Sequence, residues 1–317
     1  MAVTDPQEQY IIFRSAVQAL DAGDIETLKR LLDEHTWLLS YRCRKGELYE
    51  EGYFAGATLL NHTAGNPWRC PIPANIVDIT RLLLSRGARD EEPRPRYTIG
   101  LLLTSRQASE AGVAMPLIDL LISETGFGID LSDPNILNGP LGNHAPATAL
   151  ELIRRGARMN IRHAAMLGRL DLVERLLSED NADASLIPLP SDPSEARVQV
   201  EQAFISACQF GHNNICEFLL DHGVDPAAQA NSGQTGFHYA AHSGQLNTVK
   251  MLLQRGAPLE VKNMYGGTVL GQALWSAFNE PHKDHLAIIE TLIAAGAHVE
   301  PEWNKWIDQL RQASRTH

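Results

Sequence analysis

The feature that most restricts the fold of this 317-residue chain is an internal repeat with a period of 33 residues. Gly211 recurs as Gly244, and the leucine pair at 219–220 recurs at 252–253. A fixed period of this length predicts a row of supersecondary units, because a single unit cannot bury its apolar face alone and packs on its neighbours. The sequence therefore predicts a stacked repeat architecture.

The clearest copy covers residues 233–257, GQTGFHYAAHSGQLNTVKMLLQRGA, in which two short helical patterns flank a glycine. Thr235 can cap the first helix by accepting a hydrogen bond from a backbone N–H. Gly244 breaks the chain between the helices, and Leu252 belongs to the apolar stripe of the second helix. Gly256 can take the left-handed conformation that ends that helix.

This pattern resembles the ankyrin repeat, although Gly236 stands where that family has proline and Phe237 where it has leucine. The resemblance implies an all-α fold, an ankyrin-type solenoid of stacked helix-turn-helix repeats with short β-hairpin fingers. It also implies a structural role for His238, whose counterpart in such repeats bonds to the backbone of the neighbouring finger. We expect structural roles for Thr235, Gly244 and Gly256 as well.

Weaker copies extend the pattern, so we expect residues 1–317 to form a single ankyrin-repeat solenoid of about eight repeats. Gly139 and Pro140 oppose helix formation and predict a short or distorted turn. The expected segments are an N-terminal capping repeat at 10–35, a long insert at 36–56, divergent repeats at 58–157, a regular repeat at 160–183, a Pro- and Ser-containing loop at 184–199, the clearest repeats at 200–297 and a C-terminal capping helix at 300–313.

Two histidines four residues apart, His238 and His242, would share one face of a helix, as zinc ligands do in hydrolases. The zinc hydrolase motif requires Glu at position 239, where this chain has Tyr239, and no spacing indicates a third ligand. We therefore expect no metal site. No sequence feature calls for a cofactor.

The composition of the chain argues against some classes of partner. The formal net charge is −11, so the chain offers little cationic surface to a nucleic acid, and we expect no nucleic-acid partner. No apolar run is long enough to span a bilayer and the first residues do not form a signal peptide, so we expect no membrane association. Four cysteines, at 43, 70, 208 and 216, are too few for a disulfide framework. We expect a cytoplasmic monomer.

In the ankyrin family the fingers and first helices bind other proteins, through variable positions flanking the Ala-Ala pair. The resemblance thus implies an intracellular scaffold or adaptor that binds an unidentified protein through the concave face of the stack. The expected partner-binding residues are His62, His163, Gln209, Phe210, Tyr239, His242, Gln272 and Trp275. The insert at 36–56 mixes aromatic and charged residues, which suits either recognition or packing on its own stack.

A different class of function is a small-molecule or enzymatic site on the divergent repeats around residues 61–73. Its candidate residues are Asn61, Trp68, Arg69 and Cys70, with His62 beside them. A Cys-His pair can supply a nucleophile, but the sequence contains no phosphate-binding loop or nucleophile elbow. In the simpler interpretation, Asn61 replaces the repeat histidine and satisfies backbone groups. We favour a binding protein over an enzyme.

Overall fold

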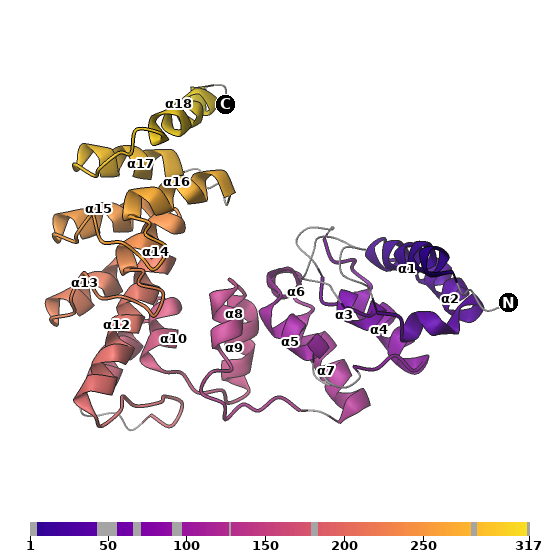
Figure 1. Cartoon of the computed structure of the whole chain (residues 1–317). Coiled ribbons are helices and arrows are strands. Elements are labelled where there is room, and N and C mark those ends of the chain that lie inside the picture. The colour runs from indigo at the N-terminus through magenta and orange to yellow at the C-terminus, as the bar shows by residue number, and fades with distance from the viewer. Residues whose placement is uncertain are drawn as a thin grey trace. The chain divides into compact units, whose positions relative to one another are not determined.

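A computed structural model describes residues 5–42, 56–65, 71–90, 97–126, 128–178, 183–279 and 284–315. The chain divides into two units, Met1–Ala157 and Arg158–His317, each built from helices in its described part (Figure 1). The helical repeat architecture confirms the predicted fold class. That all the repeats form a single solenoid stays a prediction.

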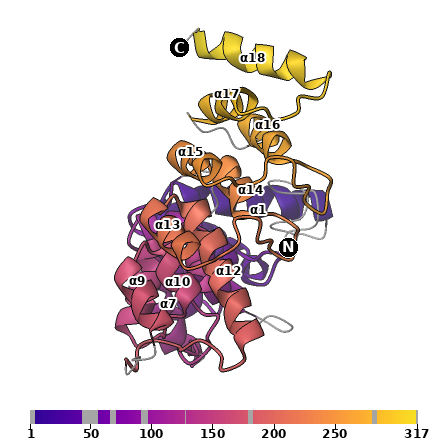
Figure 2. The same cartoon turned by 90° about the vertical axis from the view of Figure 1, so that its left-hand side faces the viewer.

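The C-terminal unit consists of helix pairs stacked one on another (Figure 2). The first helices of successive pairs pack in one row and the second helices pack in a row behind them. A final helix, α18 (Trp303–Arg315), packs on both helices of the last pair. The pairs are α10 (Ile161–Met166) with α11 (Leu170–Leu177), α12 (Pro193–Phe210) with α13 (Asn213–Asp221), α14 (Gly236–His242) with α15 (Leu246–Gln254), and α16 (Val269–Asn279) with α17 (His285–Ala294).

The N-terminal unit contains less regular pairs. The helix α5 ends at Thr104 and a short helix α6 begins two residues later, with Ser105 as its N-cap, so the connection between α5 and α7 is partly helical. The elements are α1 (Pro6–Asp21), α2 (Ile25–Glu34), the 3-10 helix η1 (Thr36–Leu39), α3 (Leu59–His62), α4 (Ile76–Ser85), α5 (Tyr97–Thr104), α6 (Arg106–Glu110), α7 (Ala114–Thr125), α8 (Asn138–Gly142) and α9 (Pro146–Arg154).

Local sequence explains how a typical pair forms. Thr235 caps α14 by accepting the backbone N–H of His238, and the His238 ring accepts the Thr235 N–H in return. Gly244 has a φ of 71° in the turn to α15, a conformation that costs glycine little. The apolar stripe of α15 is buried: Leu252 has no exposed surface. Ala240 and Ala241 are also fully buried, and their small side chains let neighbouring first helices approach closely.

Side-chain hydrogen bonds connect one repeat to the next in the C-terminal unit. The donor residue lies just before the second helix of its repeat. The acceptor is a carbonyl oxygen near the end of the first helix of the preceding repeat. His212 Nε2 donates to the Met166 carbonyl at 3.1 Å, and Gln245 Nε2 donates to the Gln209 carbonyl at 3.3 Å. These bonds satisfy carbonyl groups that a helix end leaves unpaired, and they fix the spacing of the repeats.

Two expectations about connecting segments need correction. The described residues hold no strand, and the expected β-hairpin fingers are turns with isolated bridges such as Gln229–Thr235. The expected loop at 184–199 is wrong from residue 193 onward, because α12 begins at Pro193. Asp192 caps that helix and proline is tolerated at its first position, so a residue type read as a loop signal here starts a helix.

Three other expected segments compare with the structure as follows. The insert at 36–56 begins with η1, and its residues 43–55 lie outside the described residues. The short turn predicted around Gly139 is the five-residue helix α8. The expected C-terminal capping helix at 300–313 is α18. No helix among the described residues is long and apolar enough to cross a membrane.

Candidate functional site

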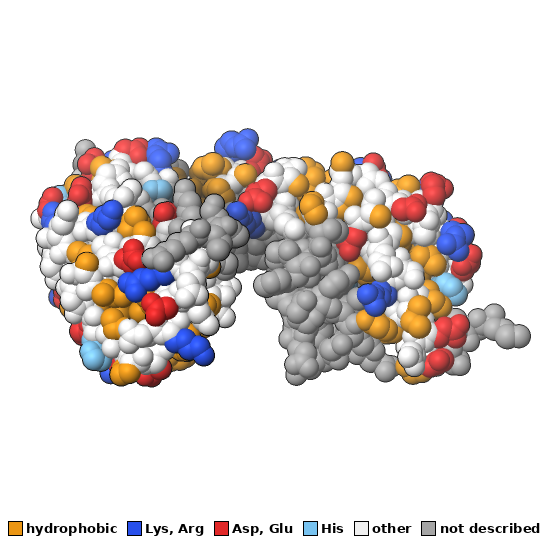
Figure 3. Space-filling model, turned by 90° about the horizontal axis from the view of Figure 1, so that it is seen from above, with side chains coloured by type: hydrophobic (Ala, Val, Ile, Leu, Met, Phe, Trp, Pro, Cys, Tyr) orange, Lys and Arg blue, Asp and Glu red, His pale blue; other side chains and the backbone are white. Residues whose placement is uncertain are grey.

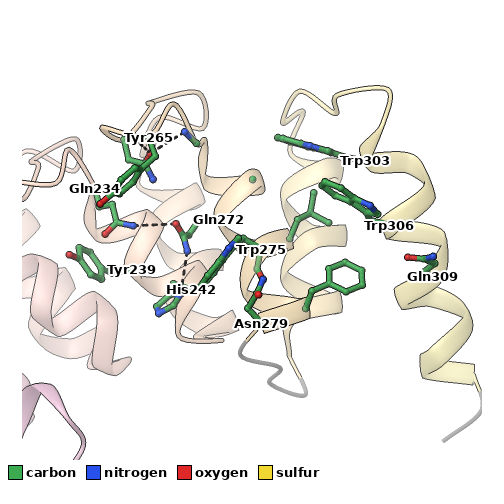
Figure 4. A pocket seen from close by; sticks show the side chains of 15 residues that line it. Gln234, Tyr239, His242, Tyr265, Gln272, Trp275, Asn279, Trp303, Trp306 and Gln309 are labelled. Carbon is green, nitrogen blue, oxygen red and sulfur yellow. Dashed lines mark hydrogen bonds between the residues drawn. The ribbon is translucent and has the colours of Figure 1, made fainter. Parts of the chain in front are cut away.

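A groove of about 850 Å³ lies on the C-terminal unit. We call it the aromatic groove. Side chains from α14, α16 and α18 line it together with the turns that precede α14 and α16 (Figure 4). Its lining residues are Gln234, Tyr239, His242, Asn263, Tyr265, Gly267, Gly271, Gln272, Leu274, Trp275, Phe278, Asn279, Trp303, Trp306 and Gln309.

Exposed aromatic rings gather at this groove. Eight large hydrophobic side chains are exposed in the described part of the chain, and the four aromatic ones all line the groove: Tyr265, Trp275, Phe278 and Trp306. Tyr265 is 81% exposed and Trp275 is 50% exposed. Exposed aromatic surface that is concentrated in one place marks an interaction site far more often than scattered apolar residues do.

Two of these rings contact aromatic neighbours. The Trp275 ring stacks on the imidazole of His242 with centroids 6.1 Å apart, and the Phe278 ring meets Trp306 of α18 edge to face at 6.5 Å. The α18 helix also covers Gly271, where a Cβ atom would lie 3.2 Å from the Trp303 ring. Packing therefore holds several rings of the groove in place before any partner binds.

A chain of hydrogen bonds fixes the polar floor of the groove (Figure 4). Gln234 Nε2 donates to Gln272 Oε1 at 3.2 Å, and Gln272 Nε2 approaches His242 Nδ1 at 3.3 Å. The hydroxyl of the buried Ser276 lies 2.8 Å from the same His242 nitrogen. His285 Nε2 donates to the His242 carbonyl at 2.9 Å. His242 is therefore oriented by contacts on both its backbone and its ring.

The structure brings together four of the expected partner-binding residues. Tyr239, His242, Gln272 and Trp275 all line the aromatic groove. Gln209 and Phe210 are half-buried at the end of α12 and do not line it. The Phe210 ring instead stacks on His212 at 6.4 Å.

Two expected partner-binding residues are wrong as surface positions, because both side chains are fully buried. His62 has no exposed surface, and its Nδ1 donates to the Thr58 carbonyl at 2.7 Å. His163 also has no exposed surface, and its Nδ1 accepts the Asn160 N–H at 3.3 Å in the capping box of α10. Burial lowers the pKa of His163 to about 4, with a smaller effect from the charge of Arg162. In both cases a histidine completes the interior of its own repeat.

The alternative site around residues 61–73 receives no support from its one described candidate. Asn61 is buried, and its side chain is fully engaged with the chain itself. Its Oδ1 accepts the Thr58 N–H at 2.8 Å, and its Nδ2 donates to Asp90 Oδ1 at 3.0 Å and to Thr98 Oγ1 at 2.9 Å. Asn61 thus has a structural role like that of the repeat histidine. Trp68, Arg69 and Cys70 lie outside the described residues.

His238 spans two repeats. Its Nδ1 accepts from Thr235, and its Nε2 donates to the Gly267 carbonyl in the next turn at 3.2 Å. Burial lowers its pKa, against the opposing effect of the bond to Gly267. The neutral ring is therefore the form that fits this site. Among the described residues, no group of three or more His, Cys, Asp and Glu side chains could hold a metal ion.

Sequence reasoning missed the groove residues on α18 and two aromatic residues at and before α16. Trp303, Trp306 and Gln309 were expected only as part of a capping helix, and Tyr265 and Phe278 were not singled out. The available signal was the density of aromatic residues: three of the five tryptophans of the chain fall between residues 275 and 306. A capping helix has a polar outer face, and two tryptophans within four residues depart from that rule.

A family model for ankyrin repeats in three copies matches residues 161–263 and, in a second placement, residues 204–302. The chain contains ankyrin repeats over residues 161–302. The matched ankyrin repeats contain the residues of the groove from Gln234 to Asn279, whereas α18 lies beyond the match. Ankyrin repeats are generally protein–protein interaction modules.

The chain is similar to several ankyrin proteins over parts of its length. It is 32% identical over 93 residues to an ankyrin repeat protein of Acanthamoeba polyphaga mimivirus, which is 29% of this chain and 21% of that protein. It is 27% identical over 160 residues to the ankyrin repeat domain-containing protein SAT10 of Stachybotrys chartarum, covering 50% of this chain and 7% of that protein. It is 42% identical over 57 residues to the human SH3 and multiple ankyrin repeat domains protein 2, covering 18% of this chain and 3% of that protein. The chain thus spans about a fifth or less of the length of these relatives.

Proposed function

We propose that this protein is a scaffold or adaptor that binds a partner protein through the aromatic groove. The observation that carries the proposal is the convergence of the four exposed aromatic rings on one groove. Tryptophan and tyrosine are the residue types that most often dominate binding energy at protein interfaces. The groove offers both, at a place where the family binds other proteins.

The preformed state of the groove supports the same proposal. Trp275 is held by His242 and Phe278 by Trp306, so these rings lose little conformational freedom when a partner docks. The hydrogen-bonded floor from Gln234 to Ser276 is likewise in place. These groove side chains are therefore already ordered in the folded protein, and binding a partner costs them little further conformational entropy.

We also propose that the partner is not a nucleic acid and that the protein acts as a monomer in the cytoplasm. The chain carries a formal net charge of −11. On the face seen in Figure 3, acidic and basic side chains are interspersed. Such a surface gives little of the counterion release that drives binding to phosphate backbones. Cys208 and Cys216 are free thiols although their sulfur atoms are 3.6 Å apart, which suits a reducing compartment.

The test compares proteins retained from a lysate of the source cells by three immobilised full-length forms. These are the wild type, a Trp275→Ala/Trp306→Ala variant, and a Val198→Ala control, since Val198 is 55% exposed on α12 and does not line the groove. We expect one or more proteins to bind the wild type and the control but not the groove variant. Equal retention by all three forms, each shown by circular dichroism to be folded, would refute the proposed site.

A further inference from the structure

The polar groups of the aromatic groove carry no formal charge. None of its lining residues is an Asp, Glu, Lys or Arg. Its polar lining consists of five amide side chains, two tyrosines, the indole groups of three tryptophans and His242. A charged partner segment would lose its hydration in the groove without gaining an ion pair, which is costly. The segment that fits the groove is therefore uncharged along the part that enters it.

The open hydrogen-bonding groups of the groove include three that can donate but cannot accept. In the part of the chain that the structure describes, the indole N–H groups of Trp275, Trp303 and Trp306 have no acceptor. An indole N–H can only donate. Three tryptophans therefore present donors that only a partner or water can satisfy.

Several acceptors of the groove are already occupied. Gln272 Oε1 accepts from Gln234, and His242 Nδ1 lies within hydrogen-bond distance of the Ser276 hydroxyl. Asn263 Oδ1 accepts the backbone N–H groups of Tyr265 and Gly267, each at 3.0 Å. Among the described residues, the side-chain oxygens of Asn279 and Gln309 stay open, but their own amide N–H groups balance them, so the three indoles are the groups without a matching acceptor. The groove complements a segment that is rich in acceptors and poor in donors.

We propose, on the basis of the proposed protein-binding function, that the aromatic groove binds a proline-rich segment in the polyproline II conformation. Such a segment keeps all its carbonyl groups free, because this helix has no internal hydrogen bonds, and its prolines have no N–H. Its compact pyrrolidine rings pack on exposed aromatic faces such as those of Tyr265 and Trp275. The indole N–H groups then donate to its carbonyl oxygens.

Other kinds of segment complement the groove less well. An α-helix uses its carbonyl groups internally along its length, so its side offers the indole donors no backbone acceptor. A β-strand presents one N–H for each carbonyl and would bring donors to indole groups that can only donate. An acidic or basic peptide meets no opposite charge among the lining residues. Proline-rich segments are bound in aromatic-lined grooves because they are already ordered before binding.

The probe is a phage-displayed library of random dodecapeptides, selected on the immobilised full-length protein. Selected sequences are then synthesised with a fluorescein label, and their affinities are measured by fluorescence anisotropy. We expect the selected sequences to be enriched in proline. Replacing their prolines with alanine should weaken binding by about tenfold or more, since the free peptide then loses its ordered conformation and its ring contacts.

Variants of the protein identify which property of the groove is recognised. Trp275→Ala/Trp306→Ala should weaken the selected peptides by about tenfold or more, as loss of aromatic anchors does, whereas Val198→Ala should leave their affinity unchanged. Trp306→Phe keeps the ring and removes the donor. It should weaken binding by roughly two- to tenfold, the effect of one lost hydrogen bond.

The outcomes separate this inference from the proposed function. Selected peptides without proline enrichment that still depend on Trp275 and Trp306 would overturn the proline-rich occupant and leave the groove as a binding site. Proline-rich peptides that bind the groove variant as tightly as the wild type would overturn the inference, because they bind elsewhere. If no selected peptide depends on the groove, the proline-rich occupant is overturned, and the comparison of proteins retained from the lysate decides the proposed function separately.

Discussion

His238 donates a hydrogen bond from Nε2 to the carbonyl oxygen of Gly267 at 3.2 Å, joining the start of α14 to the turn of the next repeat. Because the other ring nitrogen accepts from Thr235, a single imidazole closes its own helix cap and fixes the neighbouring repeat. Gly267 lines the aromatic groove, so this bond also positions one edge of the candidate site.

Replacing His238 with alanine should lower the free energy of unfolding by about 1–3 kcal/mol, because it leaves buried backbone groups without partners. Urea denaturation of the full chain, followed by circular dichroism, measures the change. The matched control is His298→Ala, since His298 is largely exposed and its change should stay within about 0.5 kcal/mol. Equal effects of the two substitutions would contradict the structural role of His238.

The fold was predictable where each residue has one local task. Thr235 as cap, Gly244 as turn and Leu252 as core follow from the sequence because helix capping, φ and apolar periodicity are local properties. The helix at Pro193 was missed because proline is both a loop former and a favoured first helical residue. Only the preceding Asp192, as N-cap, distinguishes the two.

The site was half predictable for a different reason. Tyr239 and Trp275 occupy repeat positions that the family exposes, so their sequence positions were enough to place them on a shared surface. The burial of His62 depends on how deeply its divergent copy packs, which the pattern does not contain. His163 takes the capping-box position after Asn160 that His238 takes after Thr235, so its burial follows from its place in the helix cap. Trp306 joins the groove only because α18 packs on α16, and that contact has no signature in the spacing of residues.

Gly236 stands where most ankyrin repeats have proline, and the structure supplies a reason. A Cβ atom at Gly236 would lie 2.8 Å from the Cys208 sulfur and 3.2 Å from the Phe204 ring. Gly236→Ala should therefore destabilise the protein by about 1–3 kcal/mol through overpacking, although alanine favours helix. Thermal unfolding of a double-mutant cycle with Cys208→Ala tests the cause. The two changes should compensate each other in part; strictly additive effects would show that Cys208 is not the obstacle.

Asn61→Asp replaces the side-chain NH2 group of Asn61 with an oxygen, within the buried hydrogen-bond network that joins α3 to Asp90 and Thr98. The amide that donates to Asp90 becomes a carboxylate 3.0 Å from it, so two like charges meet where a hydrogen bond was. We expect a loss of roughly 3 kcal/mol at neutral pH, from a lost charge-assisted bond and from repulsion. Because one proton shared by two carboxyl groups relieves the repulsion, acidification should restore part of the stability. Hydrogen exchange of residues 57–65 and 97–104 measures the effect locally, and no protection change there would refute the network.

The buried ring of His163 should make the stability of the C-terminal unit depend on pH. Its pKa is about 4 in the folded chain, because burial disfavours the charged ring, whereas an unfolded histidine has a pKa of about 6.5. Between these values the unfolded chain binds a proton that the folded chain does not, so acid favours unfolding. The stabilisation is complete above the unfolded pKa and declines as the pH falls toward the folded one. Between about pH 7.5 and pH 5 the expected loss from this histidine alone is about 2 kcal/mol.

His163→Gln isolates that contribution, since glutamine can keep the capping contact with Asn160 and does not titrate. Urea denaturation is followed by the tryptophan fluorescence of the C-terminal unit, in which Trp275, Trp303 and Trp306 lie. His238 has a lowered pKa in the same unit, so the variant should keep part of the pH dependence. The informative quantity is the difference between wild type and variant. If both lose the same free energy of unfolding on acidification, His163 does not hold the buried neutral ring that the structure assigns to it.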